Sequence, residues 1–132
     1  MVRKRNNQVC TCSHVSILTI SFLSPSHRKI LGRALARLPR EAIIVATKVG
    51  RYGADTFDFS AAATTASVAA SLKRLNLTRL DLVQCHDIEF GDLAAVVGGA
   101  LPALAALKAQ GIVGAVGVTG LPLATLKKVV EL

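Results

Sequence analysis

Lys48, His86 and Thr119 each stand at the end of a short apolar stretch of the chain. A lysine amine shifts its protonation equilibrium readily when it is buried. An imidazole can donate a hydrogen bond to a carbonyl oxygen or pass a proton, and a hydroxyl can bind an amide. Each residue also has a structural explanation, since Lys48 can extend to solvent, His86 can be a satisfied core histidine and Thr119 can begin a turn. Their recurrence at three successive stretch ends favours a shared site.

The stretches that precede these residues alternate with helical patterns. Continuous apolar runs are typical of strands buried on both faces, and leucines three or four residues apart are typical of helices. We expect Ser60 to cap one helix, Pro102 to divide another and Gly111 to end it. The predicted strands are 42–47, 80–85 and 114–118, and the predicted helices are 30–38, 60–75, 92–110 and 122 onward. This α-β-α-β-α-β-α order predicts an α/β fold with parallel strands.

Two architectures use such a repeat, an open doubly wound sheet and a closed eight-stranded barrel. No predicted strand is followed by the G-x-G-x-x-G spacing of dinucleotide-binding folds; Gly114, Gly117 and Gly120 lie on and after a strand instead. A complete barrel takes about 250 residues, so three strands can only be part of one. In either architecture the ligand site lies at the C-terminal ends of the strands, where the three polar residues stand.

Composition excludes several classes of function. Of the 132 residues, 52% are hydrophobic and 18% are charged, which favours a packed core over disorder. The net charge of +8 comes entirely from residues 1–40, which carry eight bases and no acid, so a nucleic-acid-binding fold is disfavoured. No apolar run reaches the roughly 20 residues of a membrane span. Three cysteines are too few for a disulfide scaffold, which favours a reduced, cytoplasmic setting.

Residues 1–26 differ in character from the rest. They combine a basic start with the apolar run Val15–Leu23, which is compatible with a targeting segment, an unstructured tail or a misplaced strand. Cys10, Cys12 and His14 could hold a metal, but a fourth ligand is missing, so no metal site is predicted. We expect a disordered leader over 1–26 that packs poorly against a domain over 27–132.

Several strings of the second segment resemble one family of enzymes. They are Ile44-Val-Ala-Thr-Lys48, the specific string Gln84-Cys-His-Asp-Ile-Glu-Phe-Gly91, and Gly117-Val-Thr-Gly-Leu-Pro-Leu123. Together they look like an aldo-keto reductase, and within that family like a plant sugar dehydrogenase. The resemblance runs from about Ile30 to Leu132, and residues 1–26 do not resemble the family's start.

The resemblance implies part of a (β/α)8 TIM barrel, with about three parallel strands and flanking helices. It also implies hydride transfer between NAD, or NADP, and a small sugar or carbonyl compound. Of the family's catalytic Asp, Tyr, Lys and His, Lys48 matches the lysine that acidifies the tyrosine, and His86 matches the histidine that orients the substrate. Thr119 matches the serine of a Ser-Asn pair that holds the nicotinamide amide. Gly120 replaces the asparagine.

Other parts of the family's site have no match. The catalytic Asp and Tyr lie on earlier strands, Tyr52 follows Lys48 instead of preceding it, and the cofactor's phosphate sites lie on later strands. We therefore expect a truncated chain and carry three hypotheses: a sugar dehydrogenase by descent, an inactive fragment that binds protein or itself through the free edges of strands 42–47 and 114–118, and a binder of anionic surfaces through its leader.

Overall fold

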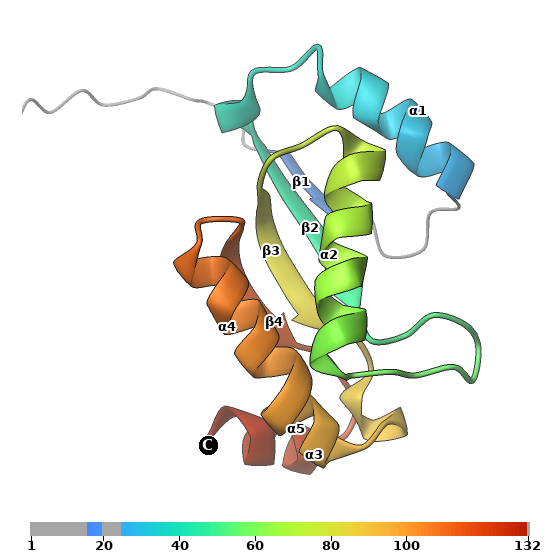
Figure 1. Ribbon diagram of the computed structural model, residues 1–132, viewed down its shortest axis with the longest axis vertical. Helices are drawn as coiled ribbons and strands as arrows, with labels where there is room; N and C mark the ends of the chain where they lie inside the picture. Colours follow the sequence, from blue (N-terminus) through green and yellow to red (C-terminus); the bar gives the residue numbers. More distant parts are fainter. Residues whose placement is uncertain (1–15, 20–24, 132) are drawn as a thin grey trace, which may run out of the picture.

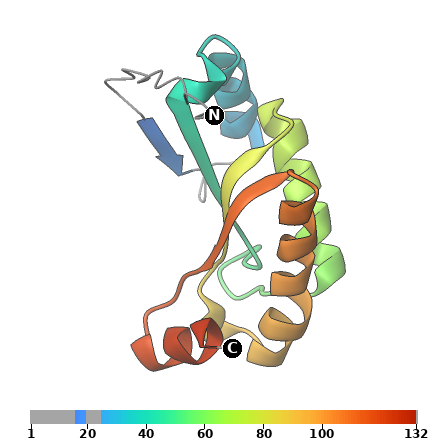
Figure 2. The same cartoon turned by 90° about the vertical axis from the view of Figure 1, so that its left-hand side faces the viewer.

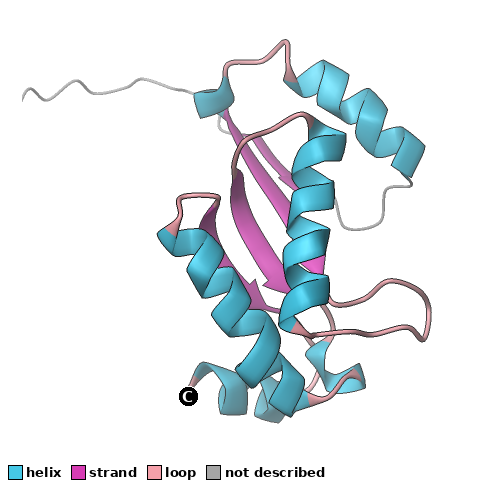
Figure 3. Cartoon of the chain, in the orientation of Figure 1, coloured by secondary structure: helices cyan, strands magenta, loops and turns pink. Residues whose placement is uncertain are grey.

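A parallel sheet with helices packed on one face forms the framework of the molecule (Figures 1 and 3). The computed structural model describes residues 16–19 and 25–131. Along the chain the described helices and strands are β1 (Ser16–Thr19), α1 (Pro25–Leu35), β2 (Ile43–Val49), α2 (Ala61–Leu75), β3 (Leu80–Cys85), α3 (Leu93–Ala95), α4 (Leu101–Ala109), β4 (Val113–Val118) and α5 (Leu123–Val130).

The order of the strands distinguishes the two architectures that the sequence left open. The sheet order is β1-β2-β3-β4, and every neighbouring pair is parallel. A doubly wound sheet reverses its strand order and carries helices on both faces, whereas a barrel adds strands in sequence with its helices outside. Here α2 and α4 cover one face, and no described helix runs along the opposite face (Figure 2). The predicted α/β class with parallel strands is confirmed, and the arrangement is that of a barrel segment.

β1 corrects two expectations about the leader. Ser16–Thr19 pairs with β2, with Ser16 opposite Ile43, so this part of 1–26 belongs to the sheet. The edge of β2 that was expected to be free is therefore paired. A strand edge with unpaired N–H and C=O groups accepts a neighbour without any helical stripe, which is why the run was not recognised as part of the domain. Residues 1–15 and 20–24, including Cys10, Cys12 and His14, lie outside the described residues.

The helices follow local signals in the sequence. At the start of α2 the Ser60 side chain accepts a hydrogen bond from the N–H of Ala63, as its capping position predicts. Asn76 ends α2 in the left-handed conformation. The predicted helix 92–110 is divided earlier than expected: α3 passes into a π-helical turn over Val96–Ala100, and Pro102 lies in the first turn of α4. The preceding π-helical turn, in which the N–H of Leu101 donates to the carbonyl of Val96 five residues back, accommodates a proline that has no N–H of its own.

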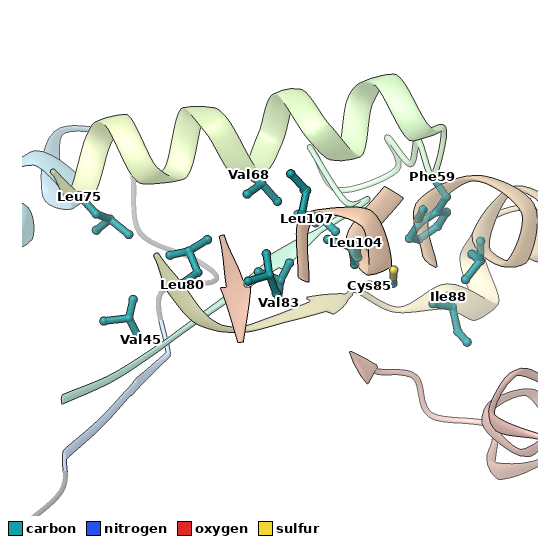
Figure 4. Packing of buried hydrophobic residues seen from close by; sticks show 14 of the residues in the cluster. Val45, Phe59, Val68, Leu75, Leu80, Val83, Cys85, Ile88, Leu104 and Leu107 are labelled. Carbon is teal, nitrogen blue, oxygen red and sulfur yellow. The ribbon is translucent and has the colours of Figure 1, made fainter. Parts of the chain in front are cut away.

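The core lies between the sheet and the α2–α4 layer (Figure 4). It is aliphatic along the strands, with one aromatic ring, Phe59, beside the loops that follow β2 and β3. Its fully buried larger side chains include Val45, Val68, Leu75, Leu80, Val83 and Leu104. Burying these side chains holds the strands against the helices. It therefore also fixes the positions of the residues at the C-terminal ends of the strands. No described helix is long and apolar enough to cross a membrane.

Candidate active site

The C-terminal ends of β2, β3 and β4 lie side by side and carry the three predicted residues. In the sheet Lys48 is opposite Gln84, and Gln84 is opposite Gly117. The pairing continues past the strand ends, because the N–H of His86 donates to the carbonyl of Val49 at 2.9 Å. The N–H of Thr119 likewise donates to the carbonyl of Cys85 at 2.8 Å. Lys48 and His86 thus lie at the same end of adjacent parallel strands, as the sequence predicts.

Lys48 and His86 line the same pocket, which has a volume of about 390 Å³. It lies among the end of β2, the loop after it and one side of α2. Its described lining residues are Lys48, Arg51, Tyr52, Asp58, Ala63, Ala66, Ser67, Arg74 and His86. Thr119 is not among them. The structure therefore brings the two predicted catalytic residues together and places the predicted cofactor-binding residue one strand away.

His86 is buried, with 6% of its surface exposed, and is surrounded by charge. Its Nε2 lies 3.3 Å from Oδ2 of Asp87. Burial lowers the pKa of His86, and the positive charges of Lys48 and Arg51 lower it further, against the opposing effect of Asp87 and Glu89. The imidazole is consequently neutral at pH 7, a form that can donate a hydrogen bond from one ring nitrogen and accept one at the other.

Arg51 connects the loop after β2 to the end of β3. Its Nη1 lies 2.6 Å from Oδ2 of Asp87, the same oxygen that contacts His86. Its other nitrogens donate to the carbonyls of Gly53 and Ala54, and its guanidinium lies over the Phe57 ring. Sequence analysis missed this ion pair, because the two residues are 36 positions apart. The available signal was their proximity in sequence to Lys48 and His86.

Phe59 holds the same two loops together from the core side. Its ring lies directly against Gly50 after β2 and Gly91 after β3, so a Cβ atom on either glycine would overlap the ring. The backbone at Gly50 also has φ +94°, a conformation that L residues rarely adopt. The two glycines thus allow the loops that carry Arg51 and Asp87 to close on one buried aromatic side chain.

Replacing Gly50 by alanine is expected to destabilise the protein more than Gly111→Ala does. Both glycines have positive φ, but nothing lies within 4 Å of a Cβ at Gly111, so that variant measures backbone strain alone. The strain is worth about 1–2 kcal/mol, and overpacking against Phe59 should add about 1–3 kcal/mol. Urea denaturation of the two variants and the parent chain measures the difference. Equal losses would contradict the role given to the Phe59 contact.

The hydroxyl of Thr119 is used within the fold. Its Oγ1 accepts a hydrogen bond from the N–H of Asp87 at 3.2 Å and donates to the carbonyl of Cys85 at 3.4 Å. A hydroxyl oxygen has two lone pairs, so one remains to accept an amide N–H from a ligand. The chemistry of this donor and acceptor set fits the amide contact that the resemblance implies for Thr119, and that role stays a prediction.

The Glu89 carboxylate lies directly against the backbone of Gly120. A Cβ at position 120 would overlap Oε2 of Glu89, and Oε1 of the same carboxylate accepts the N–H of Leu121 at 2.8 Å. The Glu89 carboxylate therefore occupies the space into which a side chain at position 120 would extend. A residue larger than glycine at this position would require the flexible end of the Glu89 side chain to shift.

Tyr52 lies in the pocket but is not placed as the family's tyrosine. It follows β2 on the loop, and its hydroxyl donates to the carbonyl of Ala63 on α2 at 3.2 Å. Among the described residues no group of His, Cys, Asp and Glu could hold a metal ion. The described part of the site therefore contains an amine, an imidazole and a hydroxyl, without an assigned acid–base tyrosine.

Comparison with known proteins shows which family the chain is similar to. The model of the Aldo/keto reductase family matches residues 24–132. L-galactose dehydrogenase of Arabidopsis thaliana is 47% identical over an alignment that covers 89% of this chain and 40% of that protein. D-arabinose 1-dehydrogenase of Saccharomyces cerevisiae is 38% identical, covering 82% of this chain and 33% of that protein. Among solved structures, the holo form of an aldo-keto reductase from Bacillus halodurans superposes with a TM-score of 0.73 at 28% identity.

These matches define the extent of the similarity as well as its kind. The chain spans about 40% of the Arabidopsis relative and 40% of the Bacillus halodurans structure, of which it matches a barrel segment. Because the Arabidopsis alignment covers 89% of the chain, it begins before residue 27, inside the segment that sequence analysis sets apart. With the family model matched over residues 24–132 and the strand-end site in place, the chain belongs to the aldo/keto reductase family.

Proposed function

We propose that this chain carries part of the active site of an L-galactose dehydrogenase, an enzyme that oxidises L-galactose to its lactone in ascorbate biosynthesis. The observation that carries the proposal is the common pocket of Lys48 and His86 at the ends of β2 and β3. The 47% identity to the Arabidopsis enzyme favours L-galactose among sugars. NAD as the preferred cofactor and a cytoplasmic location belong to the same proposal.

The chain's own residues would act on the C1 hydroxyl of the sugar. His86, neutral at pH 7, donates a hydrogen bond from its ring N–H to the hydroxyl oxygen and so orients the reacting carbon. The Lys48 ammonium stabilises the anionic form of the acid–base group that takes the hydroxyl proton. Thr119 accepts a hydrogen bond from the cofactor's amide. When bound, the nicotinamide supplies the acceptor for the hydride that leaves C1.

A second candidate is a protein-binding or self-associating fragment. The outer edge of β4 has no strand neighbour among the described residues, and Gly114 and Ala115 on it are exposed. Unpaired edges attract other strands, so this edge favours association with another chain. The corresponding argument for β2 is wrong because β1 covers its edge. Binding to anionic surfaces relied on residues 1–26, most of which lie outside the described residues.

A chimera tests the first candidate. Residues 24–132 of this chain would replace the matching stretch of the Arabidopsis L-galactose dehydrogenase, which supplies the remaining strands. We expect the chimera to form NADH, followed by absorbance, when L-galactose and NAD are both present. D-arabinose and NADP serve as comparison substrate and cofactor. A chimera with a native circular dichroism spectrum and no NADH formation would overturn the proposed function.

A further inference from the structure

We propose that Asp87 is a positioning residue for His86 and that Arg51 holds Asp87 in place, so that these three side chains form one unit. The carboxylate of Asp87 selects the ring nitrogen of His86 that carries the proton. The guanidinium of Arg51 links that choice to the loop after β2. The inference rests on the proposed function only for the statement that His86 meets the substrate.

The geometry of Asp87 supports this unit. Oδ2 of Asp87 is shared, at 2.6 Å from Nη1 of Arg51 and 3.3 Å from Nε2 of His86. The backbone of Asp87 is in the left-handed region with φ 52°, and its N–H is bonded to Oγ1 of Thr119. These backbone constraints fix the direction in which the Asp87 side chain points. A carboxylate held from both its backbone and its charge partner is a preorganised acceptor.

Arg51 is itself held in place by several contacts. Besides Asp87, it donates to the carbonyls of Gly53 at 3.2 Å and Ala54 at 3.1 Å, and it lies 5.4 Å from the centre of the Phe57 ring. All of these partners belong to the loop after β2. A movement of this loop would therefore move Arg51, and with it the Asp87 oxygen that contacts His86.

The chemical consequence concerns the proton on His86. An ionised carboxylate only accepts hydrogen bonds, so Oδ2 of Asp87, 3.3 Å from Nε2, favours the neutral tautomer of His86 that carries its proton on Nε2. This nitrogen is then a donor, the form needed to hold a sugar hydroxyl or carbonyl oxygen. A sugar oxygen would share that N–H with Asp87 or replace it. Asp87 thus favours the donor form of Nε2 before the substrate arrives.

The charges around His86 make the test sharp. Lys48, Arg51, Asp87 and Glu89 all act on it, the two cations lowering its pKa and the two carboxylates raising it. Asp87→Asn should lower the pKa of His86, because a carboxylate that favours the imidazolium is removed. Arg51→Met should raise it, because one opposing cation is removed and the Asp87 charge is left uncompensated. General loosening of the loop would not shift the two variants in opposite directions.

Asparagine is the suitable replacement at position 87. It tolerates the left-handed backbone, and its side-chain carbonyl can still accept the Nε2 proton. The variant therefore removes the charge while keeping the shape. Two controls line the same pocket without acting on His86: Asp58→Asn, whose carboxylate accepts the N–H of Ser60, and Arg74→Met. Both should leave the pKa of His86 unchanged.

The measurement is a proton NMR titration of the 132-residue chain and its four variants, with ¹⁵N shifts to identify the tautomer. His86→Gln removes one set of ring signals and so assigns it, and His14 and His27 are reference histidines in the same sample. We expect the Nε2–H tautomer in the parent and opposite shifts in Asp87→Asn and Arg51→Met. Shifts of one sign, an Nδ1–H tautomer, or three histidines that titrate together would overturn the proposal. No outcome depends on turnover, so a failure here leaves the NADH result of the chimera to decide the proposed function.

Discussion

Purified as these 132 residues alone, the chain is expected to oxidise L-galactose with NAD no faster than the background rate. Hydride leaves the sugar carbon only as its hydroxyl loses a proton, and a positioned acid–base group is typically worth about 10²–10⁴-fold. The chain has one tyrosine, and the Tyr52 hydroxyl donates to the carbonyl of Ala63 instead of taking the place of the family's tyrosine. The resemblance places the family's phosphate contacts on strands other than those matched here, so cofactor affinity should be low as well.

The assay for this prediction follows NADH formation over hours at high enzyme concentration, with the chimera as the positive control. His86→Ala and Lys48→Met are expected to give the same trace as the parent chain, because there is no catalysed rate to lose. A cofactor-dependent rate that falls in His86→Ala would contradict the prediction. It would show that the 132 residues assemble a working site, alone or by pairing with a second copy through the β4 edge.

Strands were the most predictable part of the fold. The run 80–85 is the observed β3, and 42–47 and 114–118 fall within two residues of β2 and β4. These strands pack one face against α2 and α4, and short apolar runs bounded by turn residues are typical of such strands. β1 was not predicted, because Ser16–Thr19 is a short edge strand inside an apolar run without clear alternation. Its strand conformation depends on its pairing with β2, which the sequence pattern does not show.

Pocket residues were predictable only in part. Lys48 and His86 could be found because Lys48 lies near the end of β2 and His86 directly follows β3, and parallel strands bring their C-terminal ends together. The ion pair of Arg51 with Asp87 could not be found, because it joins two loops. Loops have no periodic pattern from which the position of a side chain could be predicted. The contact of Phe59 with Gly50 and Gly91 was hidden for the same reason. The two glycines could be recognised as loop residues, but the sequence did not indicate that an aromatic ring packs against them.

In the chimera, Lys48→Met and His86→Ala are each expected to lower kcat/KM for L-galactose by about 10²-fold or more. Lys48→Met removes the charge that stabilises the anionic acid–base group, so the loss should fall mainly on kcat. Methionine keeps the unbranched stem, so the packing at the end of β2 is preserved. His86→Ala removes the hydrogen-bond donor that orients the hydroxyl, so we expect kcat to fall and KM to rise together.

Arg74→Met is the matched control, since Arg74 lines the same pocket but lies on α2, away from the strand ends. Its kcat/KM should stay within about twofold of the parent chimera, because the half-buried Arg74 forms no ion pair with another described residue, and such substitutions rarely cost more than about 0.5 kcal/mol. Steady-state kinetics on folded variants of equal thermal stability decides the comparison. If Lys48→Met or His86→Ala matched the control, the pocket would not be the catalytic centre, and the proposed function would lose the observation that carries it.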